Sequence, residues 1–223
     1  MMKVAIGCDH AGYPLKATVL RWLFAHGMEV MDMGTDSASA QVDYTDFAKP
    51  VALEVQKGYA DIGVLMCGTG LGMSLTANKI PGIRCAVLTD SFSARAAREH
   101  NNANCIALGA RVTGTGVIEE ILEAFFSASF SEEERHRRRV AKLEELERDI
   151  ARQYLEKELK DAKDILKERD KAAADTAKAA SDAKQADDAK SADTPKAADT
   201  TEKADAPVNN GSGSTDTSTK KTD

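Results

Sequence analysis

The chain has 223 residues, enough for one sizeable domain and an appendage. Its formal net charge of −6 leaves no basic surplus to neutralise phosphates, which argues against a nucleic-acid-binding protein. The N-terminal apolar run is too short for a signal peptide, and no segment could span a bilayer, so we expect a cytoplasmic protein without membrane contact. The four cysteines lie far apart without a CxxC pair, which predicts free thiols in a reducing compartment.

Short β-branched runs alternate with amphipathic runs over residues 3–126. The spacing of apolar residues predicts strands at 3–7, 29–33, 61–66, 84–88 and 104–108. It predicts helices at 15–26, 46–56, 73–79, 91–100 and 116–126. Five strand–helix units of this length are typical of the α/β class, in which a parallel sheet carries helices on both faces.

The composition changes after residue 131. Acidic residues follow Ser131 and apolar residues then recur every three or four positions, which predicts a long amphipathic helix reaching about Arg169. From Lys171 onward the chain is mostly Ala, Asp, Lys, Thr and Ser. This composition offers too little apolar surface for burial to offset the loss of chain entropy on folding. We therefore expect a domain at 1–150, a helical extension at 151–170 and a low-complexity, disordered tail at 171–223.

Reactive and polar residues gather where the predicted strands end. The segments are 8–10 (CDH), 67–70 (CGTG), 89–90 (TD) and 109–111 (GAR). Ligands of open parallel sheets bind beyond the carboxyl ends of the strands. The sequence therefore predicts a binding site at this edge.

The glycine-rich turn VLMCGTGLGM at 64–73 has several possible roles. A dinucleotide site would need GxGxxG after the first strand, whereas this turn reads GxGxG and follows the third. A tyrosine-phosphatase-like loop would need an arginine six residues after Cys67, where Met73 stands. Cys67 could also be a small apolar residue at a strand end, the commonest role of a free cysteine.

Three observations favour chemistry at this turn. The backbone amides of the turn could bind negative charge and stabilise a thiolate at Cys67. His10 and His100 fall at element ends on the same predicted edge, and Arg135 and Arg139 lie one helical turn apart, a spacing that could grip a phosphate. The arginines could equally form a solvated face or pair with the preceding glutamates. Together, a base, an oxyanion site, an imidazole and cations are what the isomerisation of a sugar phosphate requires.

Long ordered segments resemble the sugar-phosphate isomerase family of ribose-5-phosphate isomerase B and galactose-6-phosphate isomerase. They read IGCDHAGYPLK, VDYTDFA, CGTGLGMSLTANKIPGIRCAV, REHNNANCIALGARV and RHRRRV, and they spread over residues 3–150. The resemblance implies a Rossmann-like three-layer α/β/α fold with a five-stranded parallel sheet. It also implies a homodimer or dimer of dimers with active sites at the subunit interface, and no metal or organic cofactor.

The resemblance also implies roles for individual residues. Cys67 would be the base that moves a proton between C1 and C2, Thr69 would assist it, and His100 would open the sugar ring. One branch of the family carries its base as Glu at the position of Met73, so this chain fits the cysteine branch. The implied substrate-binding residues are Asp9, His10, Tyr44, Gly68, Thr69, Gly70, Leu71, Gly72, Asn101, Arg111, Arg135 and Arg139.

The expected function is interconversion of D-ribose 5-phosphate and D-ribulose 5-phosphate through an enediolate. An alternative is isomerisation of a six-carbon sugar phosphate, galactose 6-phosphate or allose 6-phosphate. A non-catalytic sugar-phosphate-binding subunit is a further alternative. The presence of both Cys67 and His100 in one chain favours a self-sufficient pentose enzyme.

Overall fold

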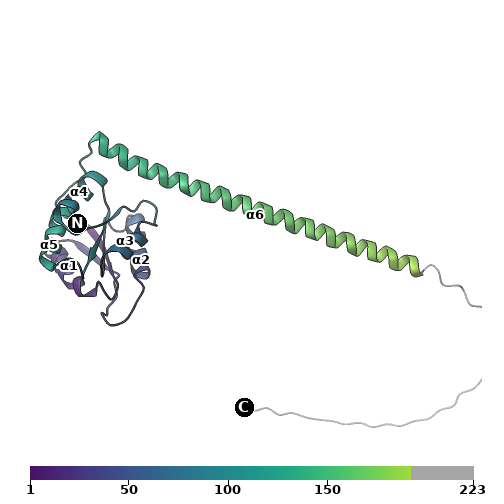
Figure 1. The fold of residues 1–223 in the computed structure, drawn as a ribbon, viewed down its shortest axis with the longest axis horizontal. Coiled ribbons are helices and arrows are strands. Elements are labelled where there is room, and N and C mark those ends of the chain that lie inside the picture. Colours follow the sequence, from purple (N-terminus) through teal and green to yellow (C-terminus); the bar gives the residue numbers. More distant parts are fainter. Residues whose placement is uncertain (192–223) are drawn as a thin grey trace, which may run out of the picture. The chain divides into compact units, whose positions relative to one another are not determined.

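A computed structural model describes residues 1–191 of the chain and the side chains of residues 1–185. It divides into two units, residues 1–160 and the residues from 161 onward. The first unit is built on a five-stranded parallel sheet of order β2-β1-β3-β5-β4 (Figure 1). The strands are β1 (Lys3–Cys8), β2 (Glu29–Asp32), β3 (Ile62–Cys67), β4 (Cys85–Val87) and β5 (Cys105–Gly109). The predicted α/β architecture is confirmed.

Helices cover both faces of the sheet (Figure 1). One face packs against α1 (Tyr13–Ala25), α4 (Ser91–Asn101) and α5 (Thr115–Phe126), and the other against α2 (Tyr44–Gln56) and α3 (Leu71–Ala77). The alternation of side chains along a strand assigns each residue to one face. Val64 and Met66 therefore belong to the core under α1, α4 and α5, whereas Leu65 and Cys67 belong to the core under α2 and α3.

The last helix, α6 (Glu134–Ser191), is longer than the sequence pattern predicts. Disorder was expected from Lys171 onward, and this expectation is wrong for residues 171–191, which are helical. Alanine has the highest helix propensity, and no glycine or proline interrupts the chain before Pro195, so this stretch forms a helix without an apolar face. The expected disorder of residues 192–223 lies outside the described residues. Within the described part, no helix combines the length and apolar character needed to cross a membrane.

Candidate active site

The sheet has a topological switch point between its neighbouring strands β1 and β3. The chain leaves β1 toward α1 on one face, and it leaves β3 toward α3 on the other. The connections after the two strands therefore diverge and leave a crevice at their carboxyl ends, the position where open α/β sheets bind ligands. The segments that begin with Asp9 and with Gly68 border this crevice.

The connection after β3 wraps around the thiol of Cys67, which is buried with 5% of the residue exposed. The N–H of Gly70 donates a hydrogen bond to the Cys67 Sγ at 3.1 Å. Gly70 reaches this position with φ of 80°, a left-handed conformation that favours glycine. The turn thus directs a backbone donor at the sulfur.

Residues after β5 and at the start of α2 lie over the same turn. The N–H groups of Ala110 and Arg111 donate to the carbonyls of Cys67 and Gly68, both at 2.9 Å. The Arg111 side chain lies against Gly68, where an added Cβ would sit 3.3 Å from its Cδ. The ring of Tyr44 lies against Gly72 in the same way, at 3.0 Å. The structure therefore brings Arg111 and Tyr44 to the Cys67 turn.

Two side chains after β1 complete this first group. Asp9 is buried, and its Oδ1 accepts the N–H of Gly12 at 2.8 Å. The Nδ1 of His10 accepts the N–H of Val42 at 3.2 Å. Since Nδ1 is the acceptor, the neutral ring carries its proton on Nε2, which is then able to donate to an anion.

Thr69 and Leu71 differ from the rest of the turn because both are exposed. The Thr69 Oγ1 accepts the N–H of Leu71 at 3.4 Å. Because the hydroxyl is otherwise free to turn toward solvent, it is available to a bound molecule.

The other predicted residues form a second group at the end of α4 and the start of α6. His100 and Asn101 are exposed at the end of α4, and Arg135 and Arg139 are exposed on α6. Arg135 donates to Glu133 at 2.8 Å, so this arginine does pair with one of the preceding glutamates, as the alternative to a phosphate-binding role states. Among the described side chains, no hydrogen bond or ion pair joins this group to the Cys67 turn.

A buried histidine that the sequence analysis did not single out supports the second group. The ring of His136 lies 4.5 Å from the ring of His100, centroid to centroid, and its Nδ1 contacts the Ser131 Oγ at 2.6 Å. Burial lowers the pKa of His136, and the nearby Arg135, His100 and Arg139 lower it further. The ring is therefore neutral at pH 7. A histidine inside a run of arginines gave no sequence signal of burial.

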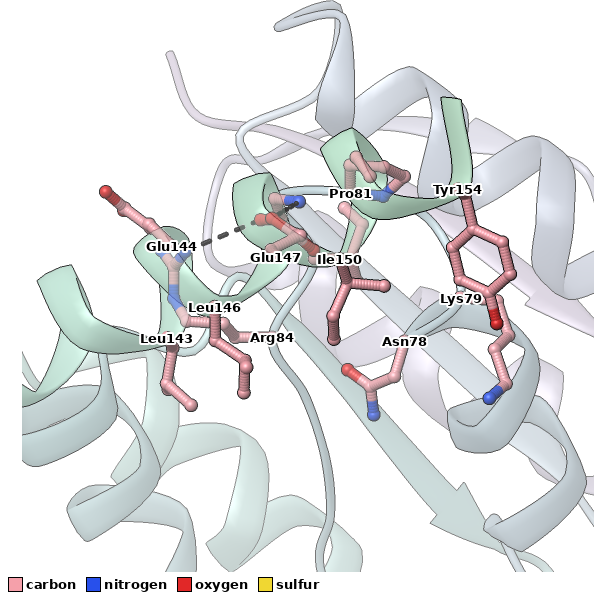
Figure 2. A pocket seen from close by; sticks show the side chains of 13 residues that line it. Asn78, Lys79, Pro81, Arg84, Leu143, Glu144, Leu146, Glu147, Ile150 and Tyr154 are labelled. Atoms are coloured by element: carbon pink, nitrogen blue, oxygen red, sulfur yellow. Dashed lines mark hydrogen bonds and ion pairs between the residues drawn. The ribbon is translucent and has the colours of Figure 1, made fainter. Parts of the chain in front are cut away.

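A further cavity is lined by residues that belong to neither group. It measures about 690 Å³, and Figure 2 shows the side chains around it, from the segment that begins at Asn78 and from α6. Its polar lining is mostly paired within the chain, because Glu147 accepts the N–H of Gly82 at 2.9 Å and Glu144 pairs with Arg84 at 3.9 Å. None of the predicted site residues lines it. In the part of the chain that the structure describes, no cluster of three or more His, Cys, Asp or Glu side chains could hold a metal ion.

Comparisons with known proteins agree on one family. The sequence profile of the family described as Ribose/Galactose Isomerase matches residues 4–143. Ribose-5-phosphate isomerase B of Escherichia coli is 43% identical over 147 residues, which cover 66% of this chain and 97% of the relative. Galactose-6-phosphate isomerase subunit LacB of Clostridium acetobutylicum is 40% identical over 145 residues, 65% of this chain and 83% of the relative. The structure of Clostridium thermocellum ribose-5-phosphate isomerase B matches with a TM-score of 0.65 at 47% identity, over 67% of this chain and 99% of that one.

Proposed function

Because the chain belongs to the Ribose/Galactose Isomerase family, we propose that it interconverts D-ribose 5-phosphate and D-ribulose 5-phosphate. The chain is an aldose–ketose isomerase. The observation that carries the choice of base is the Cys67 thiol, which lies at the crevice with the Gly70 N–H directed at its sulfur. A residue that only filled space at a strand end would not need this donor.

In the proposed reaction Cys67 acts as a thiolate base. It takes the proton from C2 of the open-chain aldose, and the electron pair forms the C1–C2 double bond of an enediolate. The proton returns to C1, while the hydroxyl proton moves from O2 to O1 and leaves a carbonyl at C2. Backbone N–H groups of residues 68–72 and the Thr69 hydroxyl would stabilise the enediolate oxygens, which carry charge only in the intermediate.

The phosphate would be held by side chains that follow β1 and β5. His10 offers its Nε2–H, and Arg111 extends over the turn at Gly68. Asp9, which precedes His10, and Tyr44, whose ring lies on Gly72 of the Cys67 turn, would contact the sugar. A planar guanidinium and a neutral imidazole donor together suit a phosphate dianion.

A second copy of the chain would complete the site. Ring opening needs an acid, and His100 and Asn101 belong to the group that has no contact with the Cys67 turn in the described chain. Arg135 and Arg139 are exposed beside that group and could reach a phosphate bound to a neighbouring subunit. We therefore place the active site at the interface of a homodimer, with the Cys67 group from one subunit and the His100 group from the other.

The test is a coupled isomerase assay on aldose phosphates of four to six carbons. We expect turnover of ribose 5-phosphate and a loss of about 10²- to 10⁴-fold in kcat for Cys67→Ala. Cys85→Ala, a buried thiol outside the crevice, is the matched control and should retain activity. Turnover of a six-carbon substrate alone would contradict the ribose 5-phosphate assignment and support galactose 6-phosphate or allose 6-phosphate as the substrate. Full activity of Cys67→Ala would rule out the base, and no turnover on any sugar phosphate would indicate a binding subunit.

A further inference from the structure

The ammonium group of Lys16 is buried in α1 below the crevice. Only 7% of the residue is exposed, and its Nζ lies 2.8 Å from the Asp32 Oδ2. The Nζ also donates to the Thr35 carbonyl at 3.0 Å and to the Gly34 carbonyl at 3.5 Å. Burial lowers the pKa of Lys16, but the hydrogen bond and charge of Asp32 outweigh this effect, so the pKa lies above its usual value and the group stays charged. Burying a charged group is unfavourable unless it is fully paired, so a buried lysine at this position indicates a specific role.

The carbonyls that Lys16 binds belong to the start of the β2–α2 connection. That segment continues the sheet beyond β2, because the N–H of Thr35 donates to the Cys8 carbonyl at 3.0 Å. Gly34 packs so closely on Cys8 that an added Cβ would lie 2.7 Å from the sulfur. Lys16 thus holds this segment against the last residue of β1, directly before Asp9 and His10.

The far end of the same connection is held by His10. The Val42 N–H donates to the His10 Nδ1, and two residues later Tyr44 starts α2 with its ring on Gly72. Between the two ends, the hydrogen bonds described for residues 37–41 stay within the connection. The Asp36 side chain is fully exposed even though it lies 3.6 Å from the Lys16 Nζ. The hydrogen bonds that join the connection to other elements therefore lie at its two ends: residues 33–35 bind β1 and Lys16, and Val42 binds His10.

We propose that Lys16 is a positioning residue for the crevice: it fixes the first attachment of residues 33–43 and so lets the Val42 amide orient His10. Removing the ammonium group would leave the Asp32 Oδ2 without its cation and the Gly34 and Thr35 carbonyls without their nitrogen donor. At its β2 end the connection would then be held only by the bonds of Met33 and Thr35 to β1, and it would move more than in the wild type. His10 would lose its fixed orientation, while Cys67 and its turn, which rest on β3 and β5, would keep theirs.

Hydrogen exchange of the full-length protein tests the attachment without reference to activity. In Lys16→Met we expect the amides of residues 35–43 to exchange at least about tenfold faster, and those of β3 and β5 to keep their rates. Lys57→Met, which removes an exposed lysine of the α2 end, is the matched control and should change neither. Unchanged exchange in residues 35–43 of folded Lys16→Met would overturn the proposal. If that variant does not fold, Asp32→Ala removes both the Lys16 partner and the acceptor of the Gly34 N–H, and the same two outcomes apply.

Kinetics test the consequence for substrate binding, and this part rests on the proposed function. In Lys16→Met we expect KM to rise about tenfold or more with kcat within about threefold, because His10 contributes to binding and not to proton transfer. Lys16→Arg, which retains charge and donors, should lie closer to the wild type. A purely structural role would lower the melting temperature and leave KM unchanged, and that result would overturn the proposal. If the wild-type protein turns over no sugar phosphate, the proposed function fails, and the exchange data still decide the role of Lys16.

Discussion

Gly12 lies against the backbone of Met66, and no other residue could take its place without moving β3. A Cβ on Gly12 would collide with the Met66 carbonyl and lie 2.8 Å from the Cys67 nitrogen. We expect Gly12→Ala to lower the free energy of unfolding by about 1–3 kcal/mol and to reduce kcat, because the strand end that carries Cys67 must shift. Denaturant unfolding and the isomerase assay measure the two effects. Gly116→Ala, with no neighbouring atom within 4 Å, is the control; equal stability of both variants would contradict the prediction.

The four thiols should differ in reactivity. Burial raises the pKa of Cys8 to about 11, that of Cys85 to about 12 and that of Cys105 further still, so these thiols are protonated at pH 8. We expect iodoacetamide at pH 8 to modify Cys67 first, and ribose 5-phosphate to slow that reaction. Peptide mass spectrometry identifies the modified residue, and guanidinium-unfolded protein, labelled at all four sites, is the control. Cys85 is as well exposed as Cys67, so earlier labelling of Cys85 would refute the ionisation argument.

The same raised pKa values predict a loss of stability at alkaline pH. Above pH 9 the unfolded chain releases thiol protons that the folded protein retains, so the free energy of unfolding falls as pH rises. A single buried thiol contributes a slope of up to about 1.4 kcal/mol per pH unit between its unfolded and folded pKa values. We expect Cys85→Ala to show a shallower decline between pH 9 and 12 than the wild type. Parallel curves from urea unfolding would show that Cys85 does not titrate as its burial implies.

A site shared between subunits makes a prediction for mixed oligomers. Cys67→Ala and His100→Ala should each be inactive as a homodimer. In a hybrid dimer, one of the two sites would combine an intact Cys67 group with an intact His100 group. Co-refolding equal amounts should therefore restore about a quarter of the wild-type activity, since half of the dimers are hybrids with one working site each. No recovered activity in a verified hybrid would mean that both residues act within one chain.

Removal of the chain after Asp170 should leave catalysis intact. All predicted site residues lie before residue 140, and the family profile ends at residue 143. We expect kcat and KM of the truncated protein to stay within about twofold of the full-length values, because every predicted site residue is retained. Loss of turnover in a folded truncation would show that the domain boundary near residue 150 is wrong.

The strands could be predicted from the sequence, and a candidate site edge proposed, because both depend on local patterns. Alternating apolar runs mark the five strands, and the edge follows from where those runs end. The observed bounds of helices and strands differ from the predicted ones where no pattern of apolar side chains marks the end of the element. For example, α3 starts at Leu71 and not at residue 73, because Gly70 in its left-handed conformation starts the helix directly after the turn.

Features that depend on tertiary contacts were missed. Lys16 looked like an ordinary polar residue of a helix, since nothing near it in sequence reveals that Asp32, Gly34 and Thr35 surround its ammonium group. His136 was missed for the same reason. The separation of His100 from Cys67 could be expected only through the family resemblance, because periodicity does not show which subunit a side chain serves. A cytoplasmic location stays a prediction.

The contacts of the glycines also set which positions of the Cys67 turn can vary during evolution. A side chain at Gly68, Gly70 or Gly72 would meet Arg111, the Ala107 carbonyl or Tyr44. Thr69 and Leu71 alternate with these glycines and point to solvent. Since Thr69 has a proposed part in the reaction, Leu71 is the position of the turn where a different side chain is best tolerated, while the three glycines keep the backbone in place. A library randomised at position 71 is thus a direct test of whether this turn limits the length of the sugar.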